Sequence, residues 1–460
     1  MRIAIVGAGV AGLTLARTLC KHGIKPVVIE RESTVGGLAR SFGYDNGAVF
    51  DIGPHRFHTD DPQVQAFIEE ILGDDMLFID RNSQLFLFDK YIPWPINLKS
   101  VASLPPRLLL RSGIDLLLPR KAKTESFEDY IIERYGKTLY KVFFKPYTEK
   151  FLNYTCANLH RDWATTGISR ATIDKKVDTT SLIGLARSVL FSPKVVTKFI
   201  YPSTGGIGVF ADKLAQEVRE AGGRFLLSTQ VACFLEDNGN IATVVTDAGE
   251  EIPVDHVFWS GSLQALRAVG EAPPSVSPLH YTSTILFNYL IKEEITQDFQ
   301  WCYFGDAKME VDRICVPRMF SPRLVPKGKE GLCIEMVCPE YSEIWHDPTR
   351  FDCVVETFLL RAGLLKSLDS VEDYHIERIR ETYPLYTLNY PRKLRAFFDW
   401  VHSTWHNITL IGRTGRFWYN NMDHSIAASL ETARRFLEDV EKGALRSGDV
   451  YSAEDRYLEK

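Results

Sequence analysis

Three observations on the sequence predict an α/β fold with a parallel sheet, whose inserted domains give the whole chain an α+β character. The first 40 residues read as strand, glycine turn, helix and strand, the order of a βαβ unit. Two later stretches, near residues 203–259 and 408–440, return to short apolar strands and amphipathic helices. The chain between them is helix-rich and aromatic in one part and alternates apolar with polar residues in the other. Since 460 residues exceed one ordinary core, two or more domains are expected.

The first βαβ unit is the most specific part of the sequence. Ile3–Val6 is a β-branched apolar run, and the glycines that follow it have the spacing G-x-G-x-x-G: Gly7, Gly9 and Gly12. Apolar residues then recur at helical spacing: Leu13, Leu15, Ala16 and Leu19. The segment Lys25–Glu30 reads as a second buried strand that ends on a carboxylate.

This pattern predicts a dinucleotide site, because each part has a physical role in binding one. Gly7 makes the tight turn, Gly9 admits a pyrophosphate close to the backbone, and Gly12 lets the helix pack on the strand. The helix N-terminus offers free N–H groups to the phosphates, and Glu30 can accept hydrogen bonds from a ribose. Glycines kept for packing alone are the alternative. NAD and FAD both fit this unit by itself.

The dinucleotide-binding Rossmann domain is expected to be built from three chain segments, residues 1–78, 199–268 and 405–442. Residues 79–198 are expected to form a largely helical insert, and residues 269–404 an antiparallel-sheet substrate domain. The charged stretch 443–460 is expected to be a frayed tail.

Individual elements within these segments follow from periodicity and turn residues. Asn238-Gly239 is a two-residue hairpin signal. The predicted helices are Val209–Ala221 and Ser425–Val440. The predicted strands are Gly223–Val231, Thr282–Lys292, Gly331–Val337, His256–Trp259 and Ile408–Arg413.

Composition excludes several classes of protein. The net charge of −5 argues against nucleic acid as a partner. The eight cysteines form no C-x-x-C motif, and no histidines have the spacing of a zinc site, so no metal is expected. The cysteines are expected to be free thiols in a reducing compartment, the cytoplasm. No run of 18 apolar residues exists, so no membrane span is expected. The apolar stretch Leu104–Leu118 is expected to be a packed helix, with membrane-surface contact as the alternative.

Several motifs together resemble a known family. Gly36-Gly37 and its surroundings resemble the second glycine motif of glutathione-reductase-like FAD proteins. Four further segments resemble UDP-galactopyranose mutase and its relatives in the flavin amine oxidase and protoporphyrinogen oxidase superfamily. They begin at Asp51 (DIGPHRFHT), Trp94 (WPIN), Phe143 (FFKPYTEK) and Gly412 (GR…YNNMD).

The resemblance implies FAD as the cofactor. His55 is expected beside the flavin ring, and the N-terminus of the helix at Met422 is expected at the pyrimidine edge of that ring. Arg413 is implied to contact flavin or phosphate. The full set of expected cofactor residues is Gly7, Gly9, Ala11, Gly12, Glu30, Arg31, Gly36, Gly37, Leu38, Ala39, Arg40, Gly53, Pro54, His55, Val231, Gly412, Arg413, Asn421, Met422, Asp423 and Ser425.

The resemblance also implies substrate and catalytic residues. Arg313 corresponds to an arginine that clamps a diphosphate, a task for which the guanidinium fork is suited; a surface arginine is the alternative. Tyr419 corresponds to a tyrosine that contacts the diphosphate, Arg170 lies near a second arginine, and Tyr386 belongs to an active-site tyrosine pair. With His55, these form the expected catalytic set.

Two departures fall on the substrate side of the resemblance. Leu152 stands where the mutases carry a tryptophan, and Asn421 stands where they carry an aspartate. The flavin-binding motifs are kept while these positions change. The identity of the sugar nucleotide is therefore left open.

Three functions remain. The first is a mutase-like enzyme in which N5 of reduced FAD attacks a nucleotide-activated sugar, which then isomerises its ring, with NAD(P)H a candidate reductant. The second is an FAD-dependent oxidoreductase acting on an amine, a porphyrinogen, a polyene or another small molecule. The third is a non-catalytic protein like the GDP-dissociation inhibitors, against which the intact glycines argue. The oligomeric state is not predicted.

Overall fold

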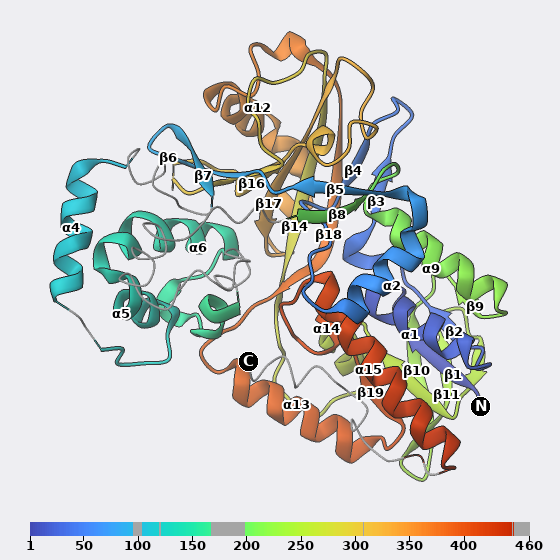
Figure 1. Cartoon of the computed structure of the whole chain (residues 1–460). Helices are drawn as coiled ribbons and strands as arrows, with labels where there is room; N and C mark the ends of the chain where they lie inside the picture. Colours follow the sequence, from blue (N-terminus) through green and yellow to red (C-terminus); the bar gives the residue numbers. More distant parts are fainter. Residues whose placement is uncertain (95–103, 119–120, 167–197, 307, 444, 446–460) are drawn as a thin grey trace.

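The computed structural model describes residues 1–94, 104–118, 121–166, 198–306, 308–443 and 445. These residues form three parts: a parallel sheet with its helices, a mixed sheet beside it, and a helical part at the far side of the mixed sheet (Figure 1). Among them, no helix combines the length and the apolar run needed to cross a bilayer.

The parallel sheet confirms the predicted Rossmann-like fold. In the described residues its order is β19 (Ile408–Leu410), β13 (His256–Trp259), β1 (Ile3–Val6), β2 (Val27–Ile29) and β9 (Arg224–Leu226). All neighbouring pairs are parallel. Its strands thus come from the beginning, the middle and the end of the chain.

Both faces of the parallel sheet are covered, as its apolar strands require. Ile3 and Ile5 of β1 pack with the helices on one face, and Ala4 and Val6 pack on the other. The helices of the first face are α1 (Val10–Lys21), α2 (Pro62–Leu72), α9 (Gly208–Glu220) and α15 (Met422–Glu441). The second face is covered by β10 (Val231–Asp237), β11 (Asn240–Thr246) and β12 (Glu251–Pro253).

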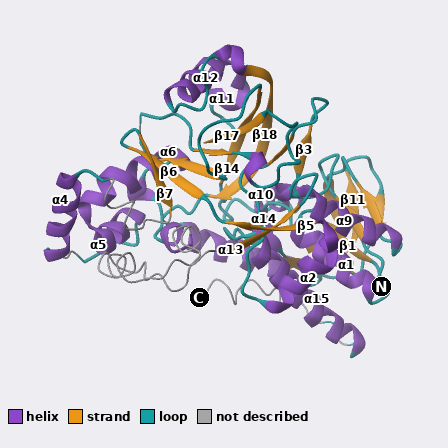
Figure 2. Ribbon diagram, turned by 45° about the horizontal axis from the view of Figure 1, so that its top comes forward, coloured by secondary structure: helices purple, strands orange, loops and turns teal. Residues whose placement is uncertain are grey.

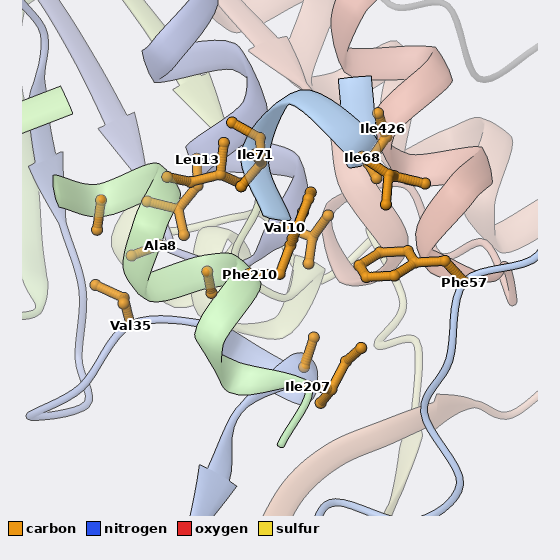
Figure 3. Close-up of a cluster of buried hydrophobic side chains, with 14 of the residues drawn as sticks. Ala8, Val10, Leu13, Val35, Phe57, Ile68, Ile71, Ile207, Phe210 and Ile426 are labelled. Carbon is orange, nitrogen blue, oxygen red and sulfur yellow. The ribbon is translucent and has the colours of Figure 1, made fainter. Parts of the chain in front are cut away.

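The core between these helices joins remote segments (Figure 3). Leu13 of α1 and Ile71 of α2 lie in one buried cluster with Phe210 of α9 and Ile426 of α15. Because each helix contributes only one apolar stripe, none of them could bury its stripe without the others.

The second sheet is mixed. Its order in the described residues is β18 (Val371–Pro384), β14 (Tyr281–Ile291), β17 (Glu330–Cys338), β16 (Arg313–Cys315), β15 (Trp301–Phe304), β6 (Ser83–Leu87) and β7 (Lys90–Trp94). The pairs are antiparallel apart from β15 with β6, which is parallel. Residues 83–94, expected in the helical insert, thus extend this sheet, because β6 pairs with a strand of the later segment.

The remaining elements pack around these sheets (Figures 1 and 2). Two short antiparallel pairs are β3 (Ser41–Gly43) with β4 (Val49–Asp51) and β5 (Met76–Asp80) with β8 (Lys198–Pro202). The helical part holds α4 (Pro106–Leu117), α5 (Phe127–Leu139) and α6 (Lys145–Leu152). The other helices are α10 (Leu263–Val269), α11 (Glu343–His346), α12 (Asp352–Arg361), α13 (Tyr390–Thr404) and α14 (Gly412–Gly415).

Three local expectations differ from the structure. The strand expected over 223–231 is interrupted, because Ser228 adopts a left-handed φ of 50° between β9 and β10. Strands β14 and β17 are buried nearly throughout instead of alternating, since both faces of their sheet are covered. Helix α4 lies at the rim of the molecule in Figure 1 and leaves Leu110 and Leu117 exposed, so it is only partly packed.

Asp51 joins the first chain segment to the second. Its buried carboxylate accepts hydrogen bonds from Ser41 Oγ (2.6 Å), Tyr201 Oη (2.5 Å) and the Ile207 backbone N–H (3.0 Å). Gly206 is required beside it, because a Cβ there would lie 2.5 Å from Asp51 Oδ1. Burial raises the pKa of Asp51 from 3.8 to about 6, despite these three bonds.

We expect Asp51→Asn to make the protein's stability less dependent on pH. A carboxyl whose folded pKa is raised stabilises the fold fully below its unfolded pKa, and this contribution is lost as the pH rises through the folded pKa. The unfolding free energy of wild type minus that of Asp51→Asn should therefore increase by about 1 kcal/mol as the pH falls from about 7 to about 5. Urea unfolding of both holoproteins at the two pH values measures it.

Tyr201→Phe is the matched control, because it removes one hydrogen bond but keeps the carboxyl. It should be less stable by about 1 to 3 kcal/mol. Its dependence on pH should be at least as steep as that of wild type, because the lost hydrogen bond had lowered the pKa of Asp51. A difference between wild type and Asp51→Asn that is constant or shrinks toward acid pH would contradict the raised pKa of Asp51.

Candidate functional site

A large cavity opens at the carboxyl ends of the parallel strands. Val6, Ile29 and Trp259, the last residues of β1, β2 and β13, all line it. The cavity continues to the mixed sheet, where Arg313 of β16 and Glu335 of β17 also line it. Ligands of open parallel sheets bind at this edge of the strands. The cavity thus connects a dinucleotide-type site to the second sheet.

The first glycine turn has the geometry expected of a phosphate-binding loop. Gly7 has a φ of 100°, and Gly9 caps the N-terminus of α1 without a side chain. A Cβ on Gly12 would lie 2.1 Å from the Gly7 carbonyl oxygen, so Gly12 is needed for packing and does not itself line the cavity. A Cβ on Gly9 would have a single neighbour within 4 Å, the Gly37 Cα. The remaining space around Gly9 belongs to the cavity.

The second glycine pair packs against the first. The Gly36 N–H donates to the Ala8 carbonyl oxygen at 2.8 Å, and Gly36 forms an isolated bridge with Gly9. A Cβ on Gly37 would lie 3.1 Å from the Gly9 Cα. Any larger residue would therefore separate the two turns.

Charged groups beside these turns are held in place by the backbone and by each other. Glu30 accepts hydrogen bonds from the Ala8 N–H (2.7 Å) and the Glu32 N–H (3.0 Å), which fix its carboxylate at the end of β2. Its oxygens have further lone pairs that a hydroxyl could use. Arg40 pairs with Glu32 at 3.1 Å, and its Nε is buried with no hydrogen-bond partner in the described structure. Arg31 pairs with Glu381 at 3.0 Å.

The structure brings nearly all of the expected cofactor residues to one cavity. Gly53 and Gly12 are the two that do not line it. Those that do are Gly7, Gly9, Ala11, Glu30, Arg31, Gly36, Gly37, Leu38, Ala39, Arg40, Pro54, His55, Val231, Gly412, Arg413, Asn421, Met422, Asp423 and Ser425.

His55 is held as a neutral imidazole at the junction between the two sheets. Burial, together with repulsion from Arg413, Arg56 and Arg313, lowers its pKa to about 3. The turn before it is tight, because Gly53 has a φ of 72° and a Cβ there would lie 2.8 Å from a Glu335 carboxylate oxygen. A neutral imidazole in this position can donate or accept a hydrogen bond but carries no charge near pH 7.

Arg313 lines the cavity, but its fork is already engaged. Its Nε and Nη2 donate to the two carboxylate oxygens of Glu335, at 2.7 and 2.5 Å, and Nη2 also lies 3.2 Å from the Tyr383 hydroxyl. Glu335 is 3% exposed. Coulombic attraction to Glu335 raises the pKa of Arg313, against the burial that lowers it. Arg313 therefore offers Nη1 and its charge to a ligand, rather than an open bidentate fork.

Arg413 and Tyr419 form one side of the cavity. The Arg413 guanidinium donates to the carbonyl oxygens of Thr382 (2.6 Å from Nη2) and Asn420 (2.8 Å from Nη1). It lies over the rings of Tyr383 and Tyr419, 5.0 and 4.6 Å from their centroids. The carbonyls and rings thus fix the position of the arginine at the cavity.

Two other expected residues have different positions. Tyr386 does not line the cavity; its hydroxyl donates to the Phe417 carbonyl oxygen (3.2 Å) and accepts from the Tyr419 N–H (2.9 Å), so it holds the segment that carries Tyr419. Arg170 lies outside the described residues.

Sequence reasoning missed two residues of this region. Trp163 stacks on Tyr419 with ring centroids 5.0 Å apart, and the tryptophan in the segment RDWA was its only signal. Arg56 lines the cavity beside His55, and its only signal in the sequence was its place between the two histidines of the segment DIGPHRFHT.

FAD fits this cavity on the evidence of the residues that line it. The close approach of Gly9 and Gly37 leaves two stretches of bare backbone, as a pyrophosphate and its attached chain require. Two helix N-termini, of α1 at Gly9 and of α15 at Asn421, face the same space and favour negative charge. The buried His55 Nδ1 and Arg40 Nε lack hydrogen-bond partners in the described structure, which a bound ligand could supply.

Comparison with known proteins agrees with this reading. The sequence profile of the flavin containing amine oxidoreductase family matches residues 10–348. A protein of Klebsiella pneumoniae named "Probable UDP-galactopyranose mutase" is 30% identical over 164 residues, which cover 32% of this chain and 40% of that protein. A dTDP-fucopyranose mutase of Escherichia coli is 27% identical over 159 residues, which cover 32% of this chain and 41% of that protein.

A plant relative and a solved structure extend the comparison. The chloroplastic protoporphyrinogen oxidase of Oryza sativa subsp. japonica is 27% identical over 159 residues, 31% of this chain and 29% of that protein. The chain thus matches less than half the length of these relatives. A crystal structure of reduced UDP-galactopyranose mutase superimposes with a TM-score of 0.81 at 21% identity, over 95% of this chain and 94% of that one. The chain belongs to the flavin containing amine oxidoreductase family, as an FAD-dependent enzyme.

Proposed function

We propose that the enzyme acts on a nucleotide-activated sugar and isomerises its ring, as UDP-galactopyranose mutase does. The proposal is supported by the fold shared along nearly the whole chain with a reduced mutase and by the partial sequence similarity to two sugar-nucleotide mutases. Bound FAD in its reduced form would supply the nucleophile, with NAD(P)H as the proposed reductant.

The observation that carries the proposal is the positive charge of the cavity beyond the dinucleotide site. Three guanidiniums, of Arg56, Arg313 and Arg413, line it together with a neutral histidine. The carboxylates that line the same end are Glu335, which pairs with Arg313, and Asp423. A cationic amine would be repelled there, whereas a leaving diphosphate would be stabilised.

The residues of this chain would divide the work as follows. Arg313 and Tyr419 would hold the diphosphate, and His55 would provide a neutral hydrogen-bonding group beside the ring of the cofactor. Tyr386 would act as a positioning residue, because its hydroxyl holds the backbone on either side of Trp418. Arg170 remains a proposed second arginine.

A second candidate is the oxidation of an anionic small molecule, such as a porphyrinogen that carries carboxylates. The cavity arginines fit such a substrate as well as a diphosphate. The similarity to protoporphyrinogen oxidase supports it. A cytoplasmic location is proposed for either function, because all eight cysteines are free thiols, as in a reducing compartment.

Gly9→Val is expected to yield a folded protein that has lost most of its FAD. A Cβ at residue 9 meets one protein atom at 4.0 Å and nothing closer, so its added side chain conflicts chiefly with the cofactor. The dissociation constant for FAD should rise at least about 10-fold, which corresponds to roughly 1.4 kcal/mol of lost binding, and the flavin absorbance per mole of purified protein should fall with it.

Gly43→Val in β3 is the matched control, because a Cβ there meets nothing within 4 Å and the residue does not line the cavity. It should retain wild-type flavin content. Normal flavin content in a folded Gly9→Val protein would show that the cofactor does not use this turn.

Binding of the diphosphate by Arg313 is tested with a pair of variants. Arg313→Ala alone would leave Glu335 buried and unpaired, so the double variant Arg313→Gln, Glu335→Gln is preferable. It should weaken nucleotide-sugar binding about 10- to 100-fold, as expected for the loss of a charged hydrogen bond of about 1.5 to 3 kcal/mol. Titration of the holoenzyme followed by flavin difference absorbance measures the affinity.

Glu335→Gln alone should bind the nucleotide sugar as tightly as wild type or more tightly, since the charge of Arg313 is then no longer neutralised. Equal affinity of the double variant and wild type would remove Arg313 from the diphosphate site. Rapid oxygen consumption with a porphyrinogen, together with no binding of nucleotide sugars, would support the second candidate instead.

A further inference from the structure

Arg56 is a half-buried cation whose donors are largely unused. It lies between the cavity residue His55 and the buried Phe57, and it lines the cavity. Its Nη1 donates to the Pro54 carbonyl oxygen at 3.0 Å, and its Cζ lies 4.9 Å from the centroid of the Trp301 ring. Within the described ranges it pairs with no carboxylate.

Arg81 brings a second guanidinium to the same tryptophan. Its Cζ lies 5.6 Å from the centroid of the Trp301 ring, and its Nε donates to Ser83 Oγ at 3.1 Å. Trp301 is 1% exposed and forms part of β15, so it is a fixed support for both cations. Burial lowers the pKa of Arg56 and of Arg81, and repulsion from Arg56 contributes to the lowering at Arg81.

The other two arginines of the cavity are occupied differently. The Arg313 fork is bound by Glu335, and Arg413 donates to the backbone at Thr382 and Asn420. Arg56 therefore makes the fewest hydrogen bonds of the three cavity arginines in the described structure. Stacking on an aromatic ring offsets only part of the cost of burying a cation, whereas an oxyanion would form charged hydrogen bonds with it.

We infer that Arg56, supported by Arg81 and Trp301, forms an oxyanion subsite that binds an acidic group of the substrate. The inference rests on the proposed function for the identity of that substrate, a nucleotide-linked sugar. Two sources supply the same chemistry, the diphosphate of the nucleotide or a carboxylate on the sugar, as in a nucleotide-linked uronic acid. If the carboxylate is the ligand, Arg56 would also help to decide which nucleotide sugar is accepted.

The test compares the affinities of Arg56→Gln, Arg56→Lys and wild-type holoenzyme for four probes. They are inorganic pyrophosphate, uridine diphosphate, a UDP-hexose and the matching UDP-hexuronate, each titrated by flavin difference absorbance or calorimetry. Arg434→Gln is the control, because Arg434 is an exposed arginine on α15, paired with Glu431 and Glu438. Flavin content and melting temperature of all variants show whether they are folded.

Two results would support the subsite, and they distinguish its ligand. If the diphosphate is the ligand, Arg56→Gln should weaken all four probes about 10- to 100-fold. If a sugar carboxylate is the ligand, the variant should weaken the UDP-hexuronate by that factor and leave the UDP-hexose within about twofold. Arg56→Lys should restore part of the loss, since it keeps the charge but not the fork.

Arg56→Gln that binds all four probes within about twofold of wild type, with normal flavin content, would overturn the subsite. Failure of the proposed function is distinguishable from this result. If the proposed function is wrong but the subsite exists, wild type would bind none of the nucleotide probes. Pyrophosphate would then still bind to wild type and not to Arg56→Gln. Wild type that fails to bind pyrophosphate as well would overturn both.

Discussion

The requirement that parallel strands be joined by long crossovers shapes this molecule. β1 lies in the middle of its sheet, between β2 and β13, and β13 pairs in turn with β19. No tight turn can connect such neighbours, so the chain leaves the sheet and returns to it. The excursions are long enough to hold the mixed sheet and the helical part. The cavity forms where these returning segments meet the carboxyl ends of the strands.

The chain segments are joined by hydrogen bonds whose donor lies on one segment and whose acceptor lies on another. Asp51 comes from β4, whereas Tyr201 and Ile207 lie on the far side of the first excursion. In the mixed sheet, Lys150 of α6 donates to three backbone carbonyl oxygens, of Phe304, Met309 and Val311. The ammonium group has three N–H donors, so it can hydrogen-bond all three of these carbonyl oxygens, which lie from the last residue of β15 to the loop before β16, the strand of Arg313. The helical part thus supports the position of an arginine that it does not contain.

Charge is distributed unevenly along the cavity. The dinucleotide end has glycine backbone, the N-terminus of α1 and Glu30, which suit a pyrophosphate and a ribose. The other end has three arginines, the carboxylates of Glu335 and Asp423, and an uncharged His55 among tyrosines. The same family fold can oxidise amines or rearrange sugars, so fold alone does not decide the reaction. The side chains that line the second end favour an anionic substrate over a cationic one.

The sequence by itself determined the elements whose reasons are local. The glycine spacing, the carboxylate at the end of β2 and the apolar period of α1 and α15 follow from backbone geometry and from one buried stripe, so they can be recognised without a fold. The hairpin at Asn238-Gly239 is another such element, with φ values of 48° and 76° at the two residues.

Only the tertiary structure decided which charges meet. Arg313 and Glu335 lie opposite each other in the register of β16 and β17, and the pairing of their side chains changes Arg313 from an open fork into a closed one. Arg56 and Arg81 converge on Trp301, which the chain order gives no reason to expect. The pairing of β6 with β15 is equally non-local. Sequence patterns report what one residue needs from its neighbours in the chain, whereas ion pairs and strand partners depend on segments that meet only after folding.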